Sequence, residues 1–471
     1  MMPDPVEKNL LLFLDPAEGL SQAVWRFVAR PKPGRETLAA LAGQGGAPGT
    51  IFCFGRSDLA GFLFLSWYAK RSALPGRARR VLYLNDGLLC SLLDADNARG
   101  YRAFAARHLP RPSRLRQRLV SLLPLALRAE RRYLVVVPDS PVAPDNTGTP
   151  GSREQALLKM QDFLFFSNPS GKLLLTSAQT LRSGKGEVLK TTANPVYAEV
   201  MEKEFATTLS IAALQGDSAS LPRVGQRFRA GNRVFFTEAY VQGKSLRDLL
   251  HALSLKGDIA GIQAFLDRLD DWFERYRAAF NGDFQPLSLC YGHLFAAFST
   301  LYGADVRAGG LLELARKTLK QIDVEHAGIA PLTAHNDLWP GNFVVGGDGL
   351  VAIDWERAVG NRAPLFDYYW MIISAALEHG VCRIGTVDYS RAFRLLLQED
   401  DAVSRKAIEM LGLFLERLGL DKNMARDFLL LFLMEWSVQG YLALGAQTAM
   451  DRLAFGELVA FAGTGAKCAI S

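Results

Sequence analysis

Short apolar runs separated by turn residues predict strands in the first third of the chain. Residues 59–70 differ, because they have the length and composition of a helix. Strands that alternate with helical stretches are typical of an α/β domain with some parallel pairing. A stretch rich in Pro, Gly, Asp and Ser, residues 139–152, then marks a domain boundary. The predicted strands are residues 50–55, 80–85 and 133–137.

The apolar pattern after this boundary predicts a second group of strands and then helices. Residues 197–215 read as a helix within the strand group. After residue 245 the apolar positions follow a helical period, and residues 265–280 are strongly amphipathic while 427–444 are mostly apolar. The second group of strands comprises residues 160–166, 172–177, 187–190, 222–224 and 234–238.

The pattern therefore predicts an α+β chain in three parts. A small α/β domain of unreadable function covers residues 1–150. A strand-rich lobe covers residues 155–242, and a helical lobe covers residues 243–471.

One hairpin interrupts the helical lobe and carries the clearest chemistry. Residues 343–345 and 350–353 read as strands around a Gly-rich turn. Such a hairpin brings Asn342 and Asp354 to its two outer ends, with Asp337 in the loop just before it. Each residue alone suits an ordinary turn. Together they suit phosphoryl transfer, in which one Asp takes the proton of a hydroxyl while an Asn and a second Asp hold Mg²⁺.

Composition excludes several classes of protein. No run of about 18 uncharged apolar residues occurs, so we predict no transmembrane helix. The acidic Asp4 and Glu7 make the start of the chain a poor signal peptide. The five Cys residues are scattered without metal-site spacing, which favours a reducing compartment and a cytoplasmic location.

Residues 99–132 form a basic cluster, with ten Arg and one acid, Glu130. An apolar segment, residues 119–127, interrupts the cluster. The basic cluster is either a solvated face or a contact for an anionic partner. Such a partner would be a membrane surface, bound peripherally, or a phosphorylated glycolipid. Nucleic acid is the least favoured partner, because interleaved aromatic residues are missing.

The sequence from His335 to Asn342, HNDLWPGN, followed by IDWE at residues 353–356, resembles the aminoglycoside phosphotransferase and choline kinase superfamily. Pro364 and Asp367 match the Pro-x-x-Asp element that follows in this superfamily. The resemblance covers about residues 160–460 and implies a protein-kinase-like, two-lobed phosphotransferase fold that uses ATP and Mg²⁺.

The resemblance also implies roles for residues of the helical lobe. Asp337 is the catalytic base, and Asn342 and Asp354 hold the metal. His335 and Asp367 are structural residues at the site.

The resemblance implies further roles in ATP binding. Lys190 ends a strand as in the Val-Ala-Ile-Lys pattern and would contact the phosphates, with Glu204 as its ion-pair partner. The backbone at Glu238 and Tyr240 would meet adenine. Ser170 and Gly171 lie in the turn where a phosphate-covering loop belongs.

The acceptor stays open at this point. We favour a hydroxyl of a sugar or sugar-like alcohol, because the additional N-terminal domain and basic cluster suit a glycan intermediate. A choline- or ethanolamine-type kinase is the alternative, since the HNDL opening and the pair Glu435 and Trp436 resemble that group. Glu356 and Trp370 are further candidates for substrate contact. A nucleotide-binding pseudokinase scaffold is the alternative of another class.

Overall fold

The computed structural model divides the chain into two compact units. We call Met1–Phe205 with Arg223–Val241 the strand unit, and Ala206–Pro222 with Gln242–Ser471 the helical unit. The structure describes residues 25–29, 49–54, 77–85, 90–94, 131–137, 163–166, 172–183, 185–192, 198–215, 221–230, 233–280, 283–326, 328–347, 349–444 and 456.

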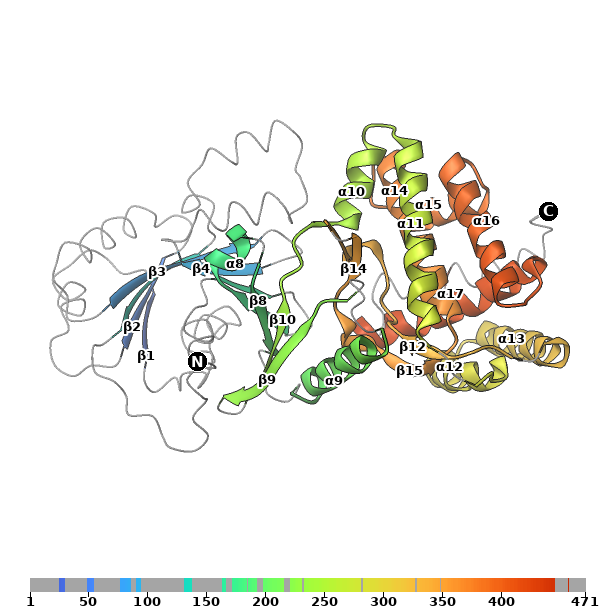
Figure 1. The fold of residues 1–471 in the computed structure, drawn as a ribbon, viewed down its shortest axis with the longest axis horizontal. Coiled ribbons are helices and arrows are strands. Elements are labelled where there is room, and N and C mark those ends of the chain that lie inside the picture. The colour runs from blue at the N-terminus through green and yellow to red at the C-terminus, as the bar shows by residue number, and fades with distance from the viewer. Residues whose placement is uncertain are drawn as a thin grey trace. The chain divides into compact units, whose positions relative to one another are not determined.

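The strand unit contains one sheet of ten strands (Figure 1). Neighbouring strands pair antiparallel, except that β1 and β2 are parallel. The three strands predicted in residues 1–150 are confirmed, but they pair antiparallel with one another, and the parallel pairing is limited to β2 and the unpredicted β1. The helix predicted at residues 59–70 lies outside the described residues. In sheet order the strands are β1 (Trp25–Ala29), β2 (Gly49–Phe54), β5 (Arg131–Val137), β3 (Arg77–Asn85), β4 (Cys90–Asp94), β6 (Phe163–Phe166), β7 (Lys172–Thr176), β8 (Glu187–Thr192), β10 (Arg233–Ala239) and β9 (Val224–Ala230).

The sheet is continuous across the predicted domain boundary. Strand β4 pairs antiparallel with β6, with Cys90 opposite Phe166. The backbone of residues 90–94 therefore continues the strands of the lobe that follows. The stretch 139–152, where we expect the boundary, lies outside the described residues.

Two helices accompany the sheet, and one predicted strand is wrong. Helix α8 (Ala178–Ser183) was not predicted, and α9 (Ala198–Gln215) matches the helix expected there. The strand expected at residues 222–224 is instead β9, which runs from Val224 to Ala230. This is an edge strand whose exposed residues alternate with half-buried ones and include Arg227 and Arg229. Because its outer face is polar, this strand contains no continuous apolar run that would predict it.

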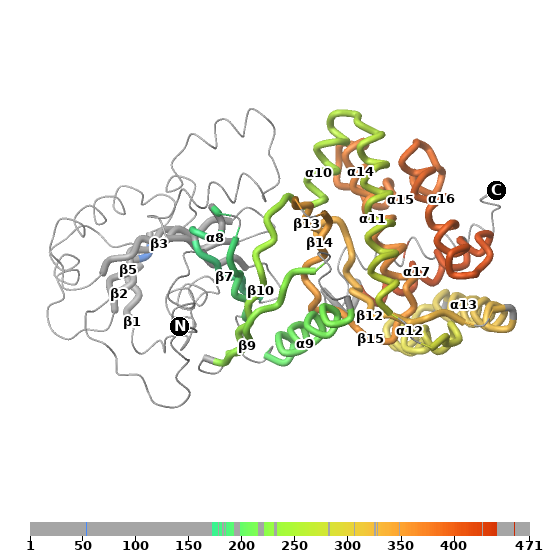
Figure 2. The backbone as a smooth tube through the Cα atoms, viewed as in Figure 1, coloured from blue at the N-terminus to red at the C-terminus, as the bar shows by residue number. Residues whose placement is uncertain are grey.

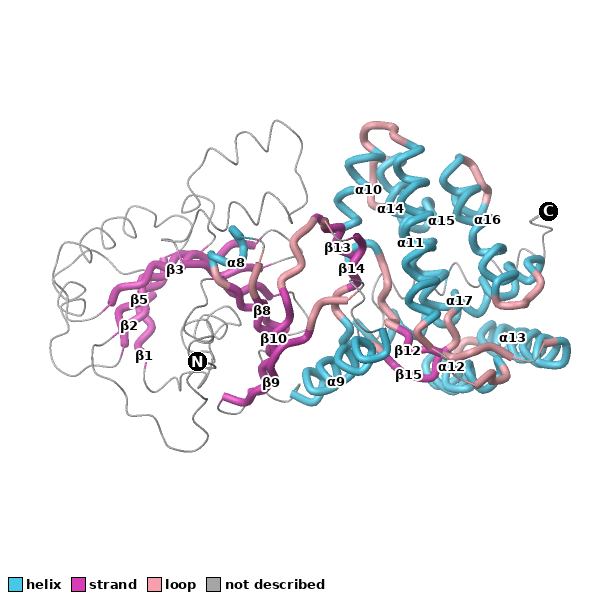
Figure 3. The backbone as a smooth tube through the Cα atoms, viewed as in Figure 1, coloured by secondary structure: helices cyan, strands magenta, loops and turns pink. Residues whose placement is uncertain are grey.

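The helical unit packs its helices around one hydrophobic core. Figure 3 draws these helices in cyan. Both predicted helical segments are confirmed within α11 and α17. No helix among the described residues is long and apolar enough to cross a membrane. The helices are α10 (Leu246–Ser254), α11 (Ile259–Ala278), α12 (Leu287–Tyr302), α13 (Val306–Glu325), α14 (Leu365–Ile384), α15 (Tyr389–Leu397), α16 (Ala402–Arg417) and α17 (Ala425–Leu444).

Helix α14 is the central element of this core. Fifteen of its 20 residues are buried, which explains why its sequence is apolar on nearly every face. It ends at Gly385, whose φ of 75° is the left-handed conformation that commonly terminates helices.

Two small sheets lie within the helical unit. The hairpin of β13 (Phe343–Gly346) and β14 (Gly349–Ala352) confirms the predicted strands, and β11 (Lys244–Ser245) pairs with β13. A second pair joins β12 (Leu332–Ala334) to β15 (Val359–Arg362). The path through these strands can be followed in Figure 2. Trp272 of α11 meets Phe343 edge-on at 5.0 Å between ring centroids, which anchors the hairpin to the core.

Candidate active site

The hairpin places Asn342 and Asp354 at neighbouring strand ends. Phe343 lies opposite Ala352, and the Ile353 N–H donates to the Asn342 carbonyl at 2.9 Å. Asn342 closes a single 3₁₀ turn (Pro340–Asn342), and Asp354 precedes another (Trp355–Arg357). Asp354 has a φ of 70°, a left-handed conformation that Asp adopts more readily than most residues. The register thus gives the juxtaposition that the sequence predicts.

Asp337 is tied directly to Asn342. The Asn342 Nδ2 donates to the Asp337 carbonyl at 2.8 Å and to its Oδ2 at 3.2 Å. Burial raises the pKa of Asp337 to about 7, the charge of Arg357 opposes this rise, and Asp354 adds to it. A carboxylate with a pKa near neutrality suits general base catalysis.

Asp367 braces the loop that carries Asp337. Its carboxylate accepts the backbone N–H of His335 and that of Asn336, the latter at 2.8 Å. The His335 ring lies 2.9 Å from the Ile353 carbonyl through Nε2 and 4.4 Å from the Trp355 ring. These contacts join the start of the loop to the end of the hairpin. They fit the structural roles expected of His335 and Asp367.

The other end of the loop is held by Trp339. A Cβ on Gly341 would lie only 2.2 Å from the Trp339 ring, so glycine is needed where this ring packs. The Arg247 guanidinium lies over the Trp339 ring, 5.5 Å from its centroid. Glu378 in turn accepts from Arg247 Nε at 3.1 Å. Helices α10 and α14 thus fix Trp339 from outside the loop.

The donor set fits a magnesium ion. Asn342 uses its amide nitrogen for Asp337, which leaves its amide oxygen as the atom for a ligand. Asp354 adds carboxylate oxygens at the neighbouring strand end. Magnesium prefers few hard oxygen ligands from the protein, so these two residues would hold it.

The strand unit contains a buried cluster of charges around Lys190. Its Nζ lies 2.9 Å from Glu204 Oε1 and 2.7 Å from Glu238 Oε2. Lys172 reaches Glu204 at 3.0 Å. Burial raises the pKa of Glu238, and Lys190 opposes the rise. The predicted Lys190–Glu204 ion pair is therefore formed, while its contact with ATP stays a prediction.

Other residues expected at ATP have different surroundings. The Tyr240 N–H donates to the Gly186 carbonyl at 2.8 Å, so this donor is already used within the strand unit. Glu238 was expected to act through its backbone, but its side chain joins the Lys190 cluster. Ser170, Gly171 and residues 99–130 of the basic cluster lie outside the described residues.

The predicted substrate residues separate into three environments. Trp436 is buried in the core, 5.1 Å from the half-buried Trp370 and 5.9 Å from Phe432 between ring centroids. Its packing does not favour an aromatic face for a choline-type ligand. Glu356 lies near Asp337 and adds to the rise in the pKa of that carboxylate. Glu435 faces a cavity instead.

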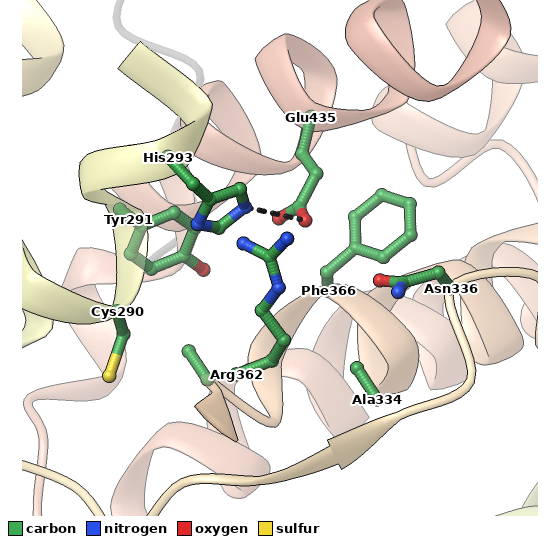
Figure 4. Close-up of a pocket in the computed structure, with 9 residues that line it drawn as sticks. Cys290, Tyr291, His293, Ala334, Asn336, Arg362, Phe366 and Glu435 are labelled. Carbon is green, nitrogen blue, oxygen red and sulfur yellow. Dashed lines mark ion pairs between the residues drawn. The ribbon is translucent and has the colours of Figure 1, made fainter. Parts of the chain in front are cut away.

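The cavity adjoins the loop of Asp337 (Figure 4). It has a volume of about 10 Å³, which is room for about one water molecule or one hydroxyl group, and it is lined by residues of α12, β12, β15, α14 and α17. The side chains of His293, Arg362 and Glu435 point toward one another there. His293 Nε2 lies 3.8 Å from Glu435 Oε1. The lining residues are Cys290, Tyr291, His293, Ala334, Asn336, Arg362, Ala363, Phe366 and Glu435.

Sequence reasoning missed three charged or titratable residues of this region. Arg357 follows the IDWE run directly, so its nearness to Asp337 was readable from local spacing. Arg362 and His293 had no such signal, because they lie on β15 and α12 and meet Glu435 only in the folded chain.

Comparison with known proteins gives structural similarities only. No family model and no curated protein matches the sequence. A thermostable mutant of aminoglycoside phosphotransferase APH(4)-Ia, in its apo form, is 14% identical with a TM-score of 0.38, covering 63% of this chain and 91% of its own. ADP-bound aminoglycoside phosphotransferase APH(2'')-Ib is 13% identical with a TM-score of 0.36, at coverages of 63% and 91%.

A protein kinase is also similar. The kinase domain of Mycobacterium tuberculosis PknI is 14% identical with a TM-score of 0.21, covering 64% of this chain and 91% of its own. The function is inferred below from the residues of the site.

Proposed function

We propose that this protein is an ATP- and Mg²⁺-dependent phosphotransferase that acts on a hydroxyl of a small molecule, a sugar or sugar-like alcohol. One observation supports this most directly. One hairpin brings Asn342 and Asp354 together, the Asn342 amide donates to Asp337, and Asp367 braces the loop. Phosphoryl transfer needs such a base beside two oxygen ligands.

Asp337 orients the acceptor hydroxyl and accepts its proton as the oxygen attacks the γ-phosphorus of ATP, and the bond from that phosphorus to the β-phosphate oxygen breaks to release ADP. Its carboxylate accepts from the Asn342 amide, and its loop is braced by Asp367. Asn342 and Asp354 would hold Mg²⁺, which supplies positive charge to the phosphates. Catalysis then consists of positioning and electrostatic stabilisation.

Lys190 would orient the phosphates of ATP, with Glu204 holding its ammonium group. The buried Glu238 is a second carboxylate partner of Lys190. Phosphate oxygens would compete with that carboxylate for the ammonium. Bound nucleotide is therefore expected to change the contacts of the Lys190 ammonium group.

The test is Asp337→Asn in the full chain, with Asp271→Asn on the exposed face of α11 as the matched control. Removing the base is expected to lower turnover by about 10²–10⁴-fold. Binding of Mg-ATP should persist, because Asn342, Asp354 and Lys190 remain. ADP release in a panel of sugars, choline and ethanolamine measures turnover, and calorimetry measures nucleotide affinity.

Two results would contradict the proposal. Turnover within a factor of a few of the unchanged chain in Asp337→Asn would remove Asp337 as the base. Mg-ATP binding without ADP release in any member of the panel would favour a pseudokinase scaffold.

A further inference from the structure

The cavity between α12, β15 and α17 holds polar groups that the chemistry at Asp337 does not use. The buried Nε of Arg362 has no hydrogen-bond partner among the described residues, and the same is true of the Asn336 Oδ1. Both residues line the cavity, together with Glu435. Leaving a buried polar atom unpaired is costly, so such atoms commonly face a water molecule or a ligand.

The orientation of Asn336 follows from its own contacts. Its Nδ2 donates to the Arg357 carbonyl at 2.9 Å, which directs the amide oxygen elsewhere. Asn336 immediately precedes Asp337, and its backbone N–H is held by Asp367. Asn336 therefore lines the cavity and also directly precedes Asp337, the base proposed for the reaction.

The charges in the cavity exclude several ligands. Burial and the nearby Arg362 lower the pKa of His293 to about 4, so this ring is neutral near pH 7. Burial raises the pKa of Glu435 to about 8 despite Arg362. A quaternary ammonium would meet the guanidinium of Arg362 and form no hydrogen bond. An anion could pair with Arg362 but would leave the Asn336 oxygen unpaired and facing negative charge.

A hydroxyl group matches all three polar residues. It donates one hydrogen bond and accepts others. It can therefore accept from Arg362 while it donates to Glu435 or Asn336. The ring of Phe366 forms an apolar wall on the same cavity, as Figure 4 shows. The space beside this apolar face admits one hydroxyl group, so a ligand would place a single one of its hydroxyls here.

We infer that Arg362, Glu435 and Asn336 form a specificity subsite for the acceptor, which binds a non-reacting hydroxyl of a neutral polyhydroxyl compound. The inference rests on the proposed function and names residues that select the acceptor. Arg362 and Glu435 are specificity residues here, since the proton transfer is assigned to Asp337.

The test compares Arg362→Met and Glu435→Met with the unchanged full chain. The control is Glu409→Gln, at an exposed residue of α16. Calorimetry measures the binding of D-glucose, D-mannose, D-galactose, myo-inositol, D-glucuronate and choline, without nucleotide. Steady-state rates with the sugar that binds best then give kcat and KM. We expect each variant to raise Kd and KM for that sugar by about tenfold to a hundredfold, which is what loss of a hydrogen bond to a charged or buried group gives. We expect kcat and the KM for ATP to change less than about twofold.

Deoxy analogues of the same sugar identify the contact. Removing the recognised hydroxyl should weaken binding to the unchanged chain, but should cost little further in Glu435→Met, because the same interaction is already lost. Additive losses for every deoxy analogue would overturn the assignment of Glu435 to a sugar hydroxyl.

The outcomes separate this inference from the proposed function. A sugar that binds in calorimetry and loses affinity in both variants supports the subsite even if no ADP is released. Altered melting temperatures with unchanged Kd and KM would overturn it and assign these groups to a buried water molecule. Tighter binding of glucuronate or choline than of every neutral sugar would also overturn it. If a Met variant fails to fold, Arg362→Lys and Glu435→Gln are measured in its place.

Discussion

Asp367 and Glu435 are two buried carboxyl groups of the helical unit with opposite surroundings. Their side chains are almost fully excluded from solvent, at 0% and 4% exposure. Burial raises the pKa of Asp367 to about 7 and that of Glu435 to about 8. Asp367 accepts two backbone N–H groups. Within the part of the chain that the structure describes, Glu435 accepts no hydrogen bond and faces a cavity.

The difference shows that burial and a raised pKa do not by themselves identify a binding residue. Asp367 has both features, yet its oxygens already accept backbone N–H groups from the loop that it braces. Glu435 has both features, but it accepts no hydrogen bond among the described residues and lines a cavity. The hydrogen-bond partners of a buried carboxyl group therefore distinguish a structural brace from a candidate binding residue.

The largest expected effect tests the residue beside Glu435. Trp436→Ala should lower the free energy of unfolding by about 3–5 kcal/mol, because it empties a core position that contacts Trp370 and Phe432. Acceptor KM of the folded fraction should stay the same. Denaturant unfolding and steady-state kinetics measure the two quantities. A raised acceptor KM with unchanged stability would return Trp436 to a choline-type site.

A smaller effect is expected for the brace. Asp367→Asn keeps one acceptor oxygen and turns an amide N–H₂ toward a backbone N–H of His335 or Asn336. One buried donor is then unpaired, which should lower the free energy of unfolding by about 1–3 kcal/mol. Turnover should fall as well, since Asp337 loses its fixed loop. Chemical denaturation checks the first effect, and loss of turnover without any loss of stability would place Asp367 in the chemistry itself.

The smallest effect concerns the pH dependence of stability. Between its ordinary pKa and about 8, Glu435 holds a proton in the folded chain and releases it on unfolding. The folded chain therefore loses stability through this group as pH rises across that window. The Glu435→Gln variant has no titratable group at this position. The neighbouring Asp367, Arg362, His293 and Tyr291 are present in both the variant and the unchanged chain, so their contributions cancel in the difference.

The stability of Glu435→Gln relative to the unchanged chain should rise by at most about 1.4 kcal/mol between pH 6 and pH 7. Urea unfolding at a series of pH values measures this difference. A difference that is constant with pH would mean that Glu435 is ionised in the folded chain. The comparison with Asp367 would then lose its electrostatic basis.

The arrangement of Asp337, Asn342 and Asp354 could be predicted because it is local. Asn342 follows five residues after Asp337, and a hairpin with a short turn brings Asp354 to the neighbouring strand end. Strand pairing converts this spacing into proximity without help from distant residues. The Lys190–Glu204 pair joins a strand to the next helix along the chain, so its two members were also readable.

The strands of the sheet were predicted where apolar runs are buried, as in β7 and β10. The edge strand β9 was misplaced because its outer face is polar. The continuous pairing of β4 with β6 was not predicted, since the sequence does not encode which strand edges meet.

By itself the sequence determined the hairpin between Asn342 and Asp354 and the lysine–glutamate pair, because residues close along the chain lie on one or two adjoining elements. Only the tertiary structure decided that Glu435 faces a cavity while Trp436 enters the core. Successive residues of a helix point about 100° apart, so packing against other helices assigns each one its surroundings. It also brought His293 and Arg362 to Glu435, from elements separated by about 70 residues or more along the chain. Long-range packing sets these contacts, and no local spacing records them.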